Sequence, residues 1–196
     1  MMKSALIIFV RTPELGKVKT RLAAEIGEEE ALKVYVKLLE HTRQIASRTE
    51  VGHFVFEAGE SSGDFWKHFA RQEQQGADLG TRMKNAFTLV FEKGYEKAVI
   101  IGSDCLELTS DCLNRAFLFL DDADVVVGPA NDGGYYLLGM KKLYVELFER
   151  KQWSTEHVFA ATIRNIEQLG LTYKLLKVLN DVDEKKDVPA DWLAGI

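Results

Sequence analysis

Four positively charged side chains lie within one short segment near the N-terminus: Arg11, Lys17, Lys19 and Arg21. Gly16, in the same segment, lets the backbone come close to a ligand, and the helix expected to follow offers free backbone N–H groups. Arginine also binds phosphate oxygens through two parallel hydrogen bonds. The segment contains neither a Walker motif nor a Gly-x-Gly-x-x-Gly fingerprint. It therefore predicts a cradle for a di- or triphosphate, and a solvated basic turn is the alternative.

A carboxylate, Asp104, stands just after an apolar run over residues 98–101 and is separated from it by Gly102 and Ser103. Magnesium is commonly bound by one or two carboxylates together with the phosphates of a substrate. We therefore expect Asp104 to be a ligand of Mg²⁺ or Mn²⁺. The alternative is that it caps the next helix, but Thr109 is better placed for that role.

Two further carboxylates, Asp181 and Asp183, follow the last apolar run of the chain. Either of them could complete a metal site begun by Asp104, because residues that follow different parallel strands meet at one edge of a sheet. The competing interpretation is that Asp183 caps a terminal helix.

Two other segments carry polar residues that suit either a structural or a binding role. Asp132, Gly133 and Gly134 form a good hairpin turn, and the residues alone favour a turn and a binding loop equally. Asp78 suits the N-cap of the following helix. Arg82, in the first turns of that helix, could reach a phosphate or a base.

Apolar runs alternate with helical patterns along most of the chain. Strands are expected at 5–10, 51–58, 98–101, 124–127, 135–140 and 172–179. Helices are expected at 18–26, 28–48, 64–70, 79–92, 110–120, 143–150, 154–169 and 183–193, with a polar loop at 72–78. This alternation is typical of a mostly parallel sheet covered on both faces, a three-layer α/β/α fold. Ligands bind beyond the carboxyl ends of such strands, which is where the candidate residues lie.

The composition limits the kind of protein. The 196 residues suffice for one domain, 1–196, and 46% hydrophobic with 28% charged residues is ordinary for a globular chain. A formal net charge of −5 gives no reason to expect nucleic acid as a partner. The two cysteines, Cys105 and Cys112, suit a reducing compartment. Neither a signal peptide nor a membrane-spanning run is evident, so we expect a cytoplasmic protein.

Five motifs occur together, in this order: Pro13-x-x-Gly16-x-Val18-Lys19-Thr20-Arg21-Leu22, Gln75-Gly76-x-Asp78-Leu79-Gly80-x-Arg82-Met83, Gly102-Ser103-Asp104-Cys105, Gly128-Pro129-x-x-Asp132-Gly133-Gly134-Tyr135 and Asp181-Val182-Asp183. They resemble the DUF2064 family of bacterial glycosyltransferase-like proteins, within the nucleotide-diphospho-sugar transferase (GT-A) superfamily. Molybdenum-cofactor and phospholactate guanylyltransferases are more distant relatives. The resemblance covers nearly the whole chain.

This resemblance implies a GT-A fold with a seven-stranded, mostly parallel sheet and one reversed strand. It also implies a nucleotide at the first loop and a metal on Asp104. Two positions depart from the family pattern: Leu106 stands where proline is common, and Glu184 stands where threonine is usual. The second departure predicts a weaker cap for the last helix.

Two transfer reactions are consistent with these residues. A glycosyltransferase moves a sugar from a nucleoside diphosphate, whereas a nucleotidyltransferase moves a nucleoside monophosphate and releases pyrophosphate. The family label favours glycosyl transfer. The single carboxylate at Asp104, with a second one distant in sequence, is closer to a nucleotidyltransferase. A non-catalytic nucleotide-binding protein is a third reading, which the charged residues at every motif disfavour.

In either reaction, Lys19 and Arg21 would neutralise phosphate charge with help from Arg11. Asp104 would bind the metal, and Asp183 is the favoured second ligand. Three further residues are candidates for binding the nucleotide: Gly16, Asp78 and Arg82.

The acceptor or sugar would face the loop that carries Asp132, Gly133, Gly134 and Tyr135, and Asp132 is a candidate general base. The expected partners are a nucleotide or nucleotide-sugar donor and a small-molecule acceptor. A homodimer is possible.

Overall fold

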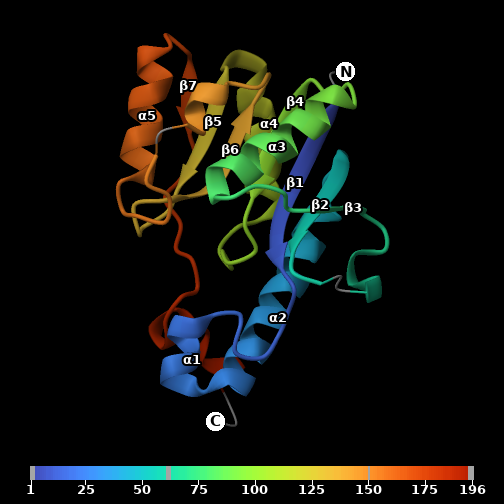
Figure 1. The fold of residues 1–196 in the computed structure, drawn as a ribbon, viewed down its shortest axis with the longest axis vertical. Helices are drawn as coiled ribbons and strands as arrows, with labels where there is room; N and C mark the ends of the chain where they lie inside the picture. Colours follow the sequence, from blue (N-terminus) through green and yellow to red (C-terminus); the bar gives the residue numbers. More distant parts are fainter. Residues whose placement is uncertain (1–2, 61–62, 150, 194–196) are drawn as a thin grey trace.

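Buried apolar segments form one seven-stranded sheet in the computed structural model, which describes residues 3–60, 63–149 and 151–193. The strands are β1 (Ser4–Arg11), β2 (Gly52–Ala58), β3 (Ala70–Glu73), β4 (Lys97–Ile101), β5 (Val125–Pro129), β6 (Tyr135–Met140) and β7 (Tyr173–Leu175). Their order across the sheet is β3-β2-β1-β4-β6-β5-β7 (Figure 1). β6 runs antiparallel to both of its neighbours, and the other pairs are parallel. The predicted mostly parallel sheet with one reversed strand is confirmed.

Helices cover both faces of this sheet. They are α1 (Thr20–Ile26), α2 (Glu28–Ala46), α3 (Leu79–Glu92), α4 (Ser110–Asp122) and α5 (Val158–Gln168). Successive side chains of a strand point to opposite faces, so Leu6 and Ile8 of β1 pack with α2 and α4. Ala5 and Ile7 pack with α3 and α5 on the other face. The three-layer α/β/α arrangement is therefore confirmed.

The helices of the described part of the chain are all too short or too polar to cross a lipid bilayer. α2 is the longest at 19 residues, and it begins with three consecutive glutamates.

The C-terminal segment packs against α1 and α2, apart from the main sheet (Figure 1). Val182 and Val188 lie in an apolar cluster with Leu22 and Val34. The helix predicted at 183–193 is wrong, because this segment forms only two short 3₁₀ helices.

Local chemistry explains that difference. The two 3₁₀ helices are Lys185–Asp187 and Ala190–Trp192. Pro189 stands between them, and proline has no backbone N–H to continue a helix. Glu184 caps the first 3₁₀ helix in a reciprocal capping box, so the expectation that this residue weakens the cap is also wrong.

Strand β3 corrects the sequence prediction, which expected a helix at 64–70 and a polar loop at 72–78. The helix is reduced to one 3₁₀ turn, Gly63–Trp66, and β3 follows it. β3 pairs with β2 on one side only. An edge strand whose side chains are exposed or half-buried needs no apolar pattern, so its sequence is also typical of a loop.

Two helices near the C-terminus are shorter than predicted. The helix expected at 143–150 contains only a 3₁₀ turn, Val145–Leu147, and its last residue lies outside the described residues. The helix expected at 154–169 begins at Val158. Ser154 has a left-handed backbone with φ 62°, which a right-handed helix cannot contain.

The strand expected at 172–179 is also shorter. β7 is three residues long, and one isolated bridge between Ala130 and Leu179 continues the pairing. Between them, the Tyr136 hydroxyl donates a hydrogen bond to the carbonyl of Lys177 at 3.0 Å. This irregular segment carries the chain from the sheet to the C-terminal carboxylates.

Gly139, in the middle of β6, lies where a larger residue has no room. A β-carbon there would lie 2.7 Å from Cγ1 of Val126 and 2.9 Å from Cγ2 of Val99. Overpacking a core typically costs about 1–3 kcal/mol. We predict that Gly139→Ala lowers the free energy of unfolding by about that amount, as measured by urea denaturation.

Gly102→Ala is the matched control, because nothing lies within 4 Å of the position of its β-carbon. It should change the free energy of unfolding by less than about 0.5 kcal/mol. Equal losses at both positions would contradict the packing argument.

Candidate active site

The carboxyl ends of β1, β4, β5 and β7 meet at one edge of the sheet, the lower edge in Figure 1. The candidate catalytic and metal-binding residues follow these four strands in sequence. Backbone hydrogen bonds join the segments: Val182 donates to the carbonyl of Asp104 at 2.9 Å, and Asn131 donates to that of Leu179 at 3.0 Å. The fold thus gathers residues that are far apart in the chain.

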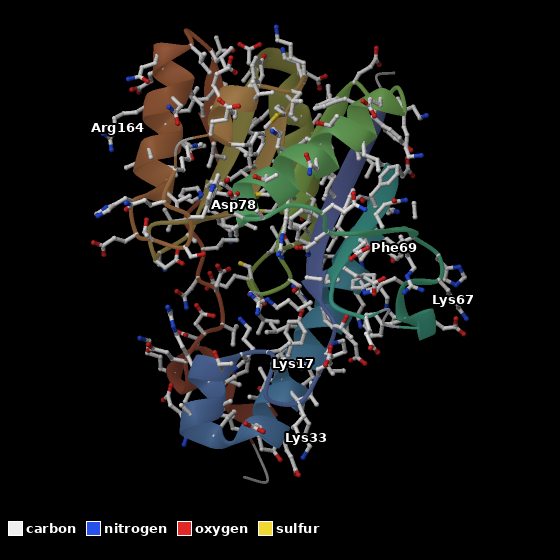
Figure 2. All side chains as sticks on the ribbon, in the orientation of Figure 1. Lys17, Lys33, Lys67, Phe69, Asp78 and Arg164 are labelled. Atoms are coloured by element: carbon white, nitrogen blue, oxygen red, sulfur yellow. The ribbon has the colours of Figure 1, made fainter. Side chains whose placement is uncertain are left out.

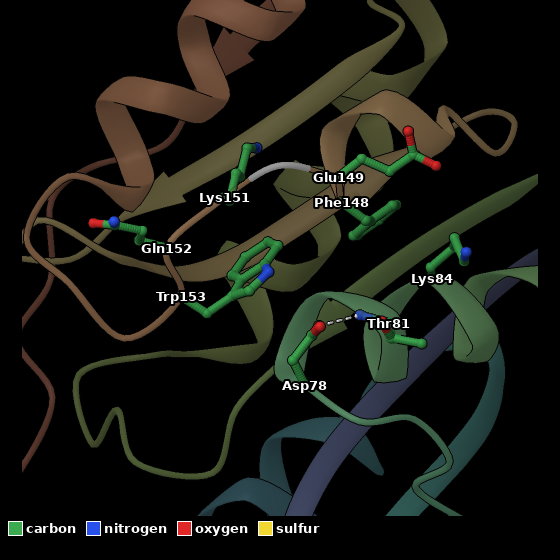
Figure 3. A pocket seen from close by; sticks show the side chains of 8 residues that line it. All are labelled: Asp78, Thr81, Lys84, Phe148, Glu149, Lys151, Gln152 and Trp153. Carbon is green, nitrogen blue, oxygen red and sulfur yellow. Dashed lines mark hydrogen bonds between the residues drawn. The ribbon is translucent and has the colours of Figure 1, made fainter.

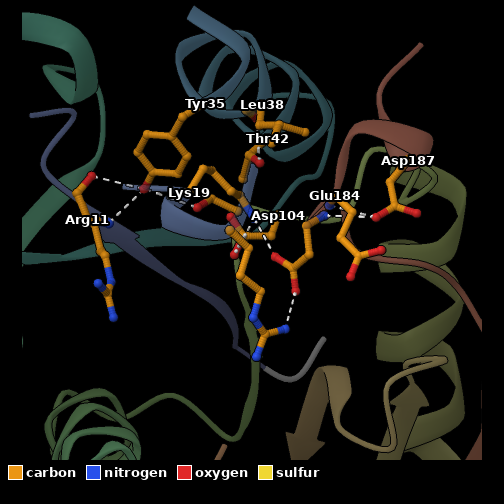
Figure 4. Close-up of polar contacts among 11 residues, drawn as sticks. Arg11, Lys19, Tyr35, Leu38, Thr42, Asp104, Glu184 and Asp187 are labelled. Carbon is orange, nitrogen blue, oxygen red and sulfur yellow. Dashed lines mark hydrogen bonds and ion pairs between the residues drawn. The ribbon is translucent and has the colours of Figure 1, made fainter. Parts of the chain in front are cut away.

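Lys19 is the charged residue that pairs with carboxylates from two other segments at this edge. Its Nζ lies 3.1 Å from Oδ2 of Asp104 and 3.1 Å from Oδ1 of Asp183 (Figure 4). The Lys19 side chain is 5% exposed, whereas those of Asp104 and Asp183 are 44% and 40% exposed. A buried ammonium therefore sits beneath two carboxylates that are open to solvent.

The backbone and the charge of Lys19 are both unusual. Its φ of 48° and ψ of 48° are left-handed, which costs a non-glycine residue about 1–2 kcal/mol. Burial by itself would lower the pKa of Lys19, but Asp104 and Asp183 outweigh it and raise that pKa above 10.5. The ammonium is therefore charged at neutral pH. Strain of this kind is often held at functional sites.

Asp181, two residues before Asp183, is a third half-buried carboxylate near this group. Burial is the main cause that raises the pKa of Asp181 to about 7, and repulsion from Asp104, Asp132 and Asp183 adds to it. The backbone hydrogen bond from Asn131 to Leu179 holds the loop after β5 beside the segment that leads to Asp181. Of the two candidate second ligands, Asp183 is the one that shares Lys19 with Asp104.

Asp104 and Asp183 suit a divalent cation whose remaining ligands come from substrate phosphates and water. Within the described residues, no group of three or more His, Cys, Asp or Glu side chains is arranged to hold a metal ion. Asp104 and Asp183, however, already direct one oxygen each at the same cation, the Lys19 ammonium. Two carboxylates completed by substrate phosphates and water fit the coordination of Mg²⁺. The metal role of these residues remains a prediction.

The other basic residues of the first segment are more exposed than Lys19. Nη1 of Arg21 lies 3.8 Å from Oδ2 of Asp183, and the Arg21 side chain is largely exposed. Lys17 lies on the surface, where it pairs with Glu14 at 2.5 Å (Figure 2). Arg11 is also exposed. Arg11 and Arg21 are therefore accessible to an anionic ligand.

Two features fix the shape of the first segment. Gly16 has a left-handed φ of 74°, and a β-carbon there would approach the Glu28 carboxylate at 3.2 Å. The buried hydroxyl of Tyr35 accepts a hydrogen bond from the backbone N–H of Arg11 at 2.9 Å and donates one to its carbonyl at 3.0 Å. The same hydroxyl lies 3.4 Å from Oγ of Ser103. Tyr35 thus ties the ends of β1 and β4 together.

The sequence analysis missed this role of Tyr35, which reads as part of an apolar helical stripe. A phenol on that stripe was the available signal, because a buried tyrosine hydroxyl usually finds a partner.

The loop after β5 forms a turn and also packs closely against the segment that leads into α5. Oδ1 of Asp132 accepts a hydrogen bond from the backbone N–H of Gly134 at 2.8 Å. Gly133 has φ 84°, and a β-carbon there would lie 2.1 Å from the carbonyl oxygen of Glu156. Phe159 donates its backbone N–H to the carbonyl of Gly133 at 2.9 Å. These contacts hold Asp132 in place relative to α5.

Tyr135, a predicted contact for the acceptor, packs into the core at the start of β6. Its hydroxyl donates to Sδ of Met83 at 3.8 Å, and burial raises its pKa above the ordinary 10. The structure therefore directs this side chain toward α3, and its role toward a substrate remains a prediction.

The N-terminal end of α3 has the predicted cap. Oδ1 of Asp78 accepts a hydrogen bond from the backbone N–H of Thr81 at 2.8 Å. Nε of Arg82 donates to the carbonyl of Gly76 at 3.0 Å, which fixes the loop before the helix. Neither contact brings Asp78 or Arg82 into the ion pairs around Lys19, so their nucleotide roles remain predictions.

A cavity of about 480 Å³ opens beside this helix end (Figure 3). Its lining is Asp78, Thr81, Lys84, Phe148, Glu149, Lys151, Gln152 and Trp153. The indole of Trp153 packs on Gly80, where a β-carbon would lie 2.3 Å from its Nε1. The segment after Trp153 leads to Glu156, which contacts the loop that carries Asp132. The sequence analysis gave Trp153 no role in a cavity, because the contact with Gly80 depends on tertiary structure.

The fold is that of nucleotide-diphospho-sugar transferases. A structure from Desulfovibrio desulfuricans G20, provisionally named a nucleotide-diphospho-sugar transferase, is 30% identical with a TM-score of 0.89 over 94% of this chain and 84% of that one. The chain belongs to the DUF2064 family, described as uncharacterized proteins conserved in bacteria, whose sequence profile matches residues 31–155.

Two more distant structures share the fold. CMP:2-keto-3-deoxy-manno-octonic acid synthetase complexed with CTP is 8% identical, with a TM-score of 0.64 and 97% of each chain covered. The inositol-1-phosphate CTP transferase from T. maritima is 14% identical, with a TM-score of 0.58 over 100% of this chain and 98% of that one. Comparison with curated proteins gives no match.

The hydrogen bonds by which Tyr35 ties β1 to β4, called the Tyr35 clamp below, can be tested by measuring the free energy of unfolding. Tyr35→Phe removes the partner of both the N–H and the carbonyl of Arg11. Leaving partly buried backbone groups unsatisfied costs about 1–3 kcal/mol, so we predict a loss of that size in the free energy of unfolding. Tyr173→Phe removes only an exposed hydrogen bond to Glu167 and should change it by less than about 0.5 kcal/mol. Similar effects in both variants would argue against a clamp.

Proposed function

We propose that this chain is a metal-dependent transferase that uses a nucleotide-activated donor, and that it transfers the sugar of a nucleoside-diphosphate sugar. One observation carries the proposal: Lys19, Asp104 and Asp183 converge at the carboxyl edge of the sheet. A lysine for phosphate and two carboxylates for a divalent cation are the groups that binding a nucleoside diphosphate requires.

In this proposal, Lys19 and the exposed Arg21 bind the phosphates, and Arg11 lies at the end of β1 to assist them. Asp104 and Asp183 hold Mg²⁺ or Mn²⁺, which would supply the charge that stabilises a departing diphosphate. Gly16, which has no side chain, would let the backbone N–H groups of this segment approach the phosphates. Asp78 and Arg82 border the nucleotide at the α3 end of the site.

The acceptor would bind on the side of the loop that contains Asp132. Oδ1 of Asp132 is engaged by Gly134, and no hydrogen bond to Oδ2 occurs among the described residues. Asp132 would take the proton from an attacking acceptor hydroxyl. Gly133, Gly134 and Tyr135 shape the loop that presents Asp132 to the acceptor.

The cavity beside Trp153 is the natural extension of the acceptor site, because it is joined to the Asp132 loop through Glu156. Its lining combines two lysines with two carboxylates and two aromatic rings. Polar and charged side chains predominate in this lining, so it would suit a polar acceptor.

Nucleotidyl transfer is the second candidate, and a specific observation favours it. The two carboxylates that share Lys19 come from separate segments, one after β4 and one after β7, and not from a single Asp-x-Asp. The similarity in fold to cytidylyltransferases is consistent with that arrangement. The 30% identity to the Desulfovibrio protein supports glycosyl transfer, so we place it first.

Nucleotide binding gives the first test. We predict that one nucleotide sugar raises the melting temperature in the presence of Mg²⁺ or Mn²⁺, since a ligand at ~100 times its Kd stabilises a fold by about 2.7 kcal/mol. Asp104→Asn should lose this shift, because it removes a metal ligand. Asp111→Asn, at an exposed position on the first turn of α4, should retain it.

The pattern of ligands separates the candidates. If a nucleoside triphosphate stabilises the chain and no nucleotide sugar does, nucleotidyl transfer replaces glycosyl transfer as the favoured function. The transferase proposal fails if no nucleotide raises the melting temperature. It also fails if the nucleotide raises the melting temperatures of Asp104→Asn and Asp111→Asn by the same amount.

Turnover tests the role of Asp132. General-base catalysis typically contributes ~10²–10⁴-fold, so we predict that Asp132→Asn lowers kcat by that factor. The dissociation constant of the donor should change far less than kcat, because Asp132 is proposed to face the acceptor. An Asp132→Asn enzyme with undiminished turnover would remove Asp132 from the mechanism.

A further inference from the structure

The Lys19 ammonium lies where the proposed function expects a divalent metal, so its position bears on metal binding as well as on phosphate binding. It lies at 3.1 Å from one oxygen each of Asp104 and Asp183, and the Lys19 side chain is 5% exposed (Figure 4). These are the same two carboxylates that the proposed function assigns to the metal. The cation between them in this structure is the lysine itself.

Lysine and a divalent cation would compete for this position. A metal bound to both carboxylates would lie close to the ammonium, and like charges a few Å apart repel each other. The described residues also provide no third acidic ligand arranged with these two. A metal that arrives alone therefore meets two carboxylates whose charge Lys19 already offsets in part, and it finds too few ligands.

Phosphate groups change this balance in two ways. They provide the oxygens that Mg²⁺ and Mn²⁺ need beyond two carboxylates. They also give the lysine a new anion to bind, and its flexible four-carbon stem allows the ammonium to turn toward it. Arg21, which is exposed and 3.8 Å from Asp183, provides a second cation for a phosphate on that side.

We infer that Lys19 acts as a resident cation that excludes free divalent metal, so that metal enters this site only together with a phosphate-bearing ligand. This inference rests on the proposed function for the identity of the ligand. By linkage, the phosphate ligand raises the affinity for metal by the same factor by which metal raises the affinity for the phosphate ligand.

Metal binding without any nucleotide tests the exclusion. Mn²⁺ alone is titrated into the full chain, and free Mn²⁺ is measured by electron paramagnetic resonance. Lys19→Met is expected to bind Mn²⁺ at least ten-fold more tightly than the wild type, because it removes the competing charge and keeps an unbranched side chain. Lys33→Met removes a surface lysine that pairs with Glu30 on α2, and it should bind Mn²⁺ like the wild type.

Lys19→Arg keeps the positive charge and should therefore retain the weak binding of the wild type. Circular dichroism of each variant verifies the fold, so a change in affinity is not mistaken for unfolding. If Lys19→Met and the wild type bind Mn²⁺ alone equally, or if Lys19→Arg gains as much as Lys19→Met, the inference is overturned.

A second binding experiment uses inorganic pyrophosphate as the phosphate-bearing ligand. This choice requires no assumption about the base or the sugar of the natural ligand. Calorimetry should detect the Mn²⁺–pyrophosphate complex binding to the wild type, and Lys19→Met should bind this complex at least ten-fold more weakly. Undiminished binding of the complex by Lys19→Met would also overturn the inference, because Lys19 would then not move to the phosphates.

The two proposals can fail separately. If nucleotides bind with metal but Lys19→Met gains no affinity for Mn²⁺ alone, the inference fails and the proposed function stands. If Lys19→Met behaves as expected toward Mn²⁺ and pyrophosphate but no nucleotide binds, the proposed function fails and the inference stands.

Discussion

The buried ammonium of Lys19 is the interaction on which the candidate site depends, because it joins three segments that are distant in sequence. Asp104 follows β4, Asp183 follows the irregular segment after β7, and Lys19 itself precedes α1. A buried charge needs anionic partners, and in this structure the two carboxylates provide them. The left-handed backbone at Lys19 is the local cost of aiming its side chain inward.

The rest of the structure serves this arrangement. The parallel strands bring their carboxyl ends to one edge, and Tyr35 fixes the exit of β1 against β4. The C-terminal segment leaves the sheet and is anchored by Val182 and Val188 in the cluster with α1 and α2. This anchoring sets Asp183 over Lys19, so apolar packing outside the sheet determines the electrostatics at its edge.

Much of this could be predicted from the sequence, and the exceptions have physical causes. Apolar runs predicted the central strands, and placing residues after those strands predicted that Asp104 and Asp183 would meet. The partner of Lys19 was not predictable, since a flexible side chain chooses its partner in three dimensions. β3 carries no apolar pattern because it is a polar edge strand. At the C-terminus, Pro189 interrupts the helical pattern because it has no backbone N–H.

In the proposed function, Lys19, Asp104 and Asp183 bind a metal and a nucleoside diphosphate together. The most direct measurement is anomalous X-ray scattering from a crystal of the chain grown with Mn²⁺ and the nucleotide that stabilises it. The account predicts one Mn²⁺ between Asp104 and Asp183, with Nζ of Lys19 moved from these carboxylates onto a phosphate oxygen. A nucleotide bound elsewhere, or Lys19 still paired with both carboxylates beside the nucleotide, would contradict it.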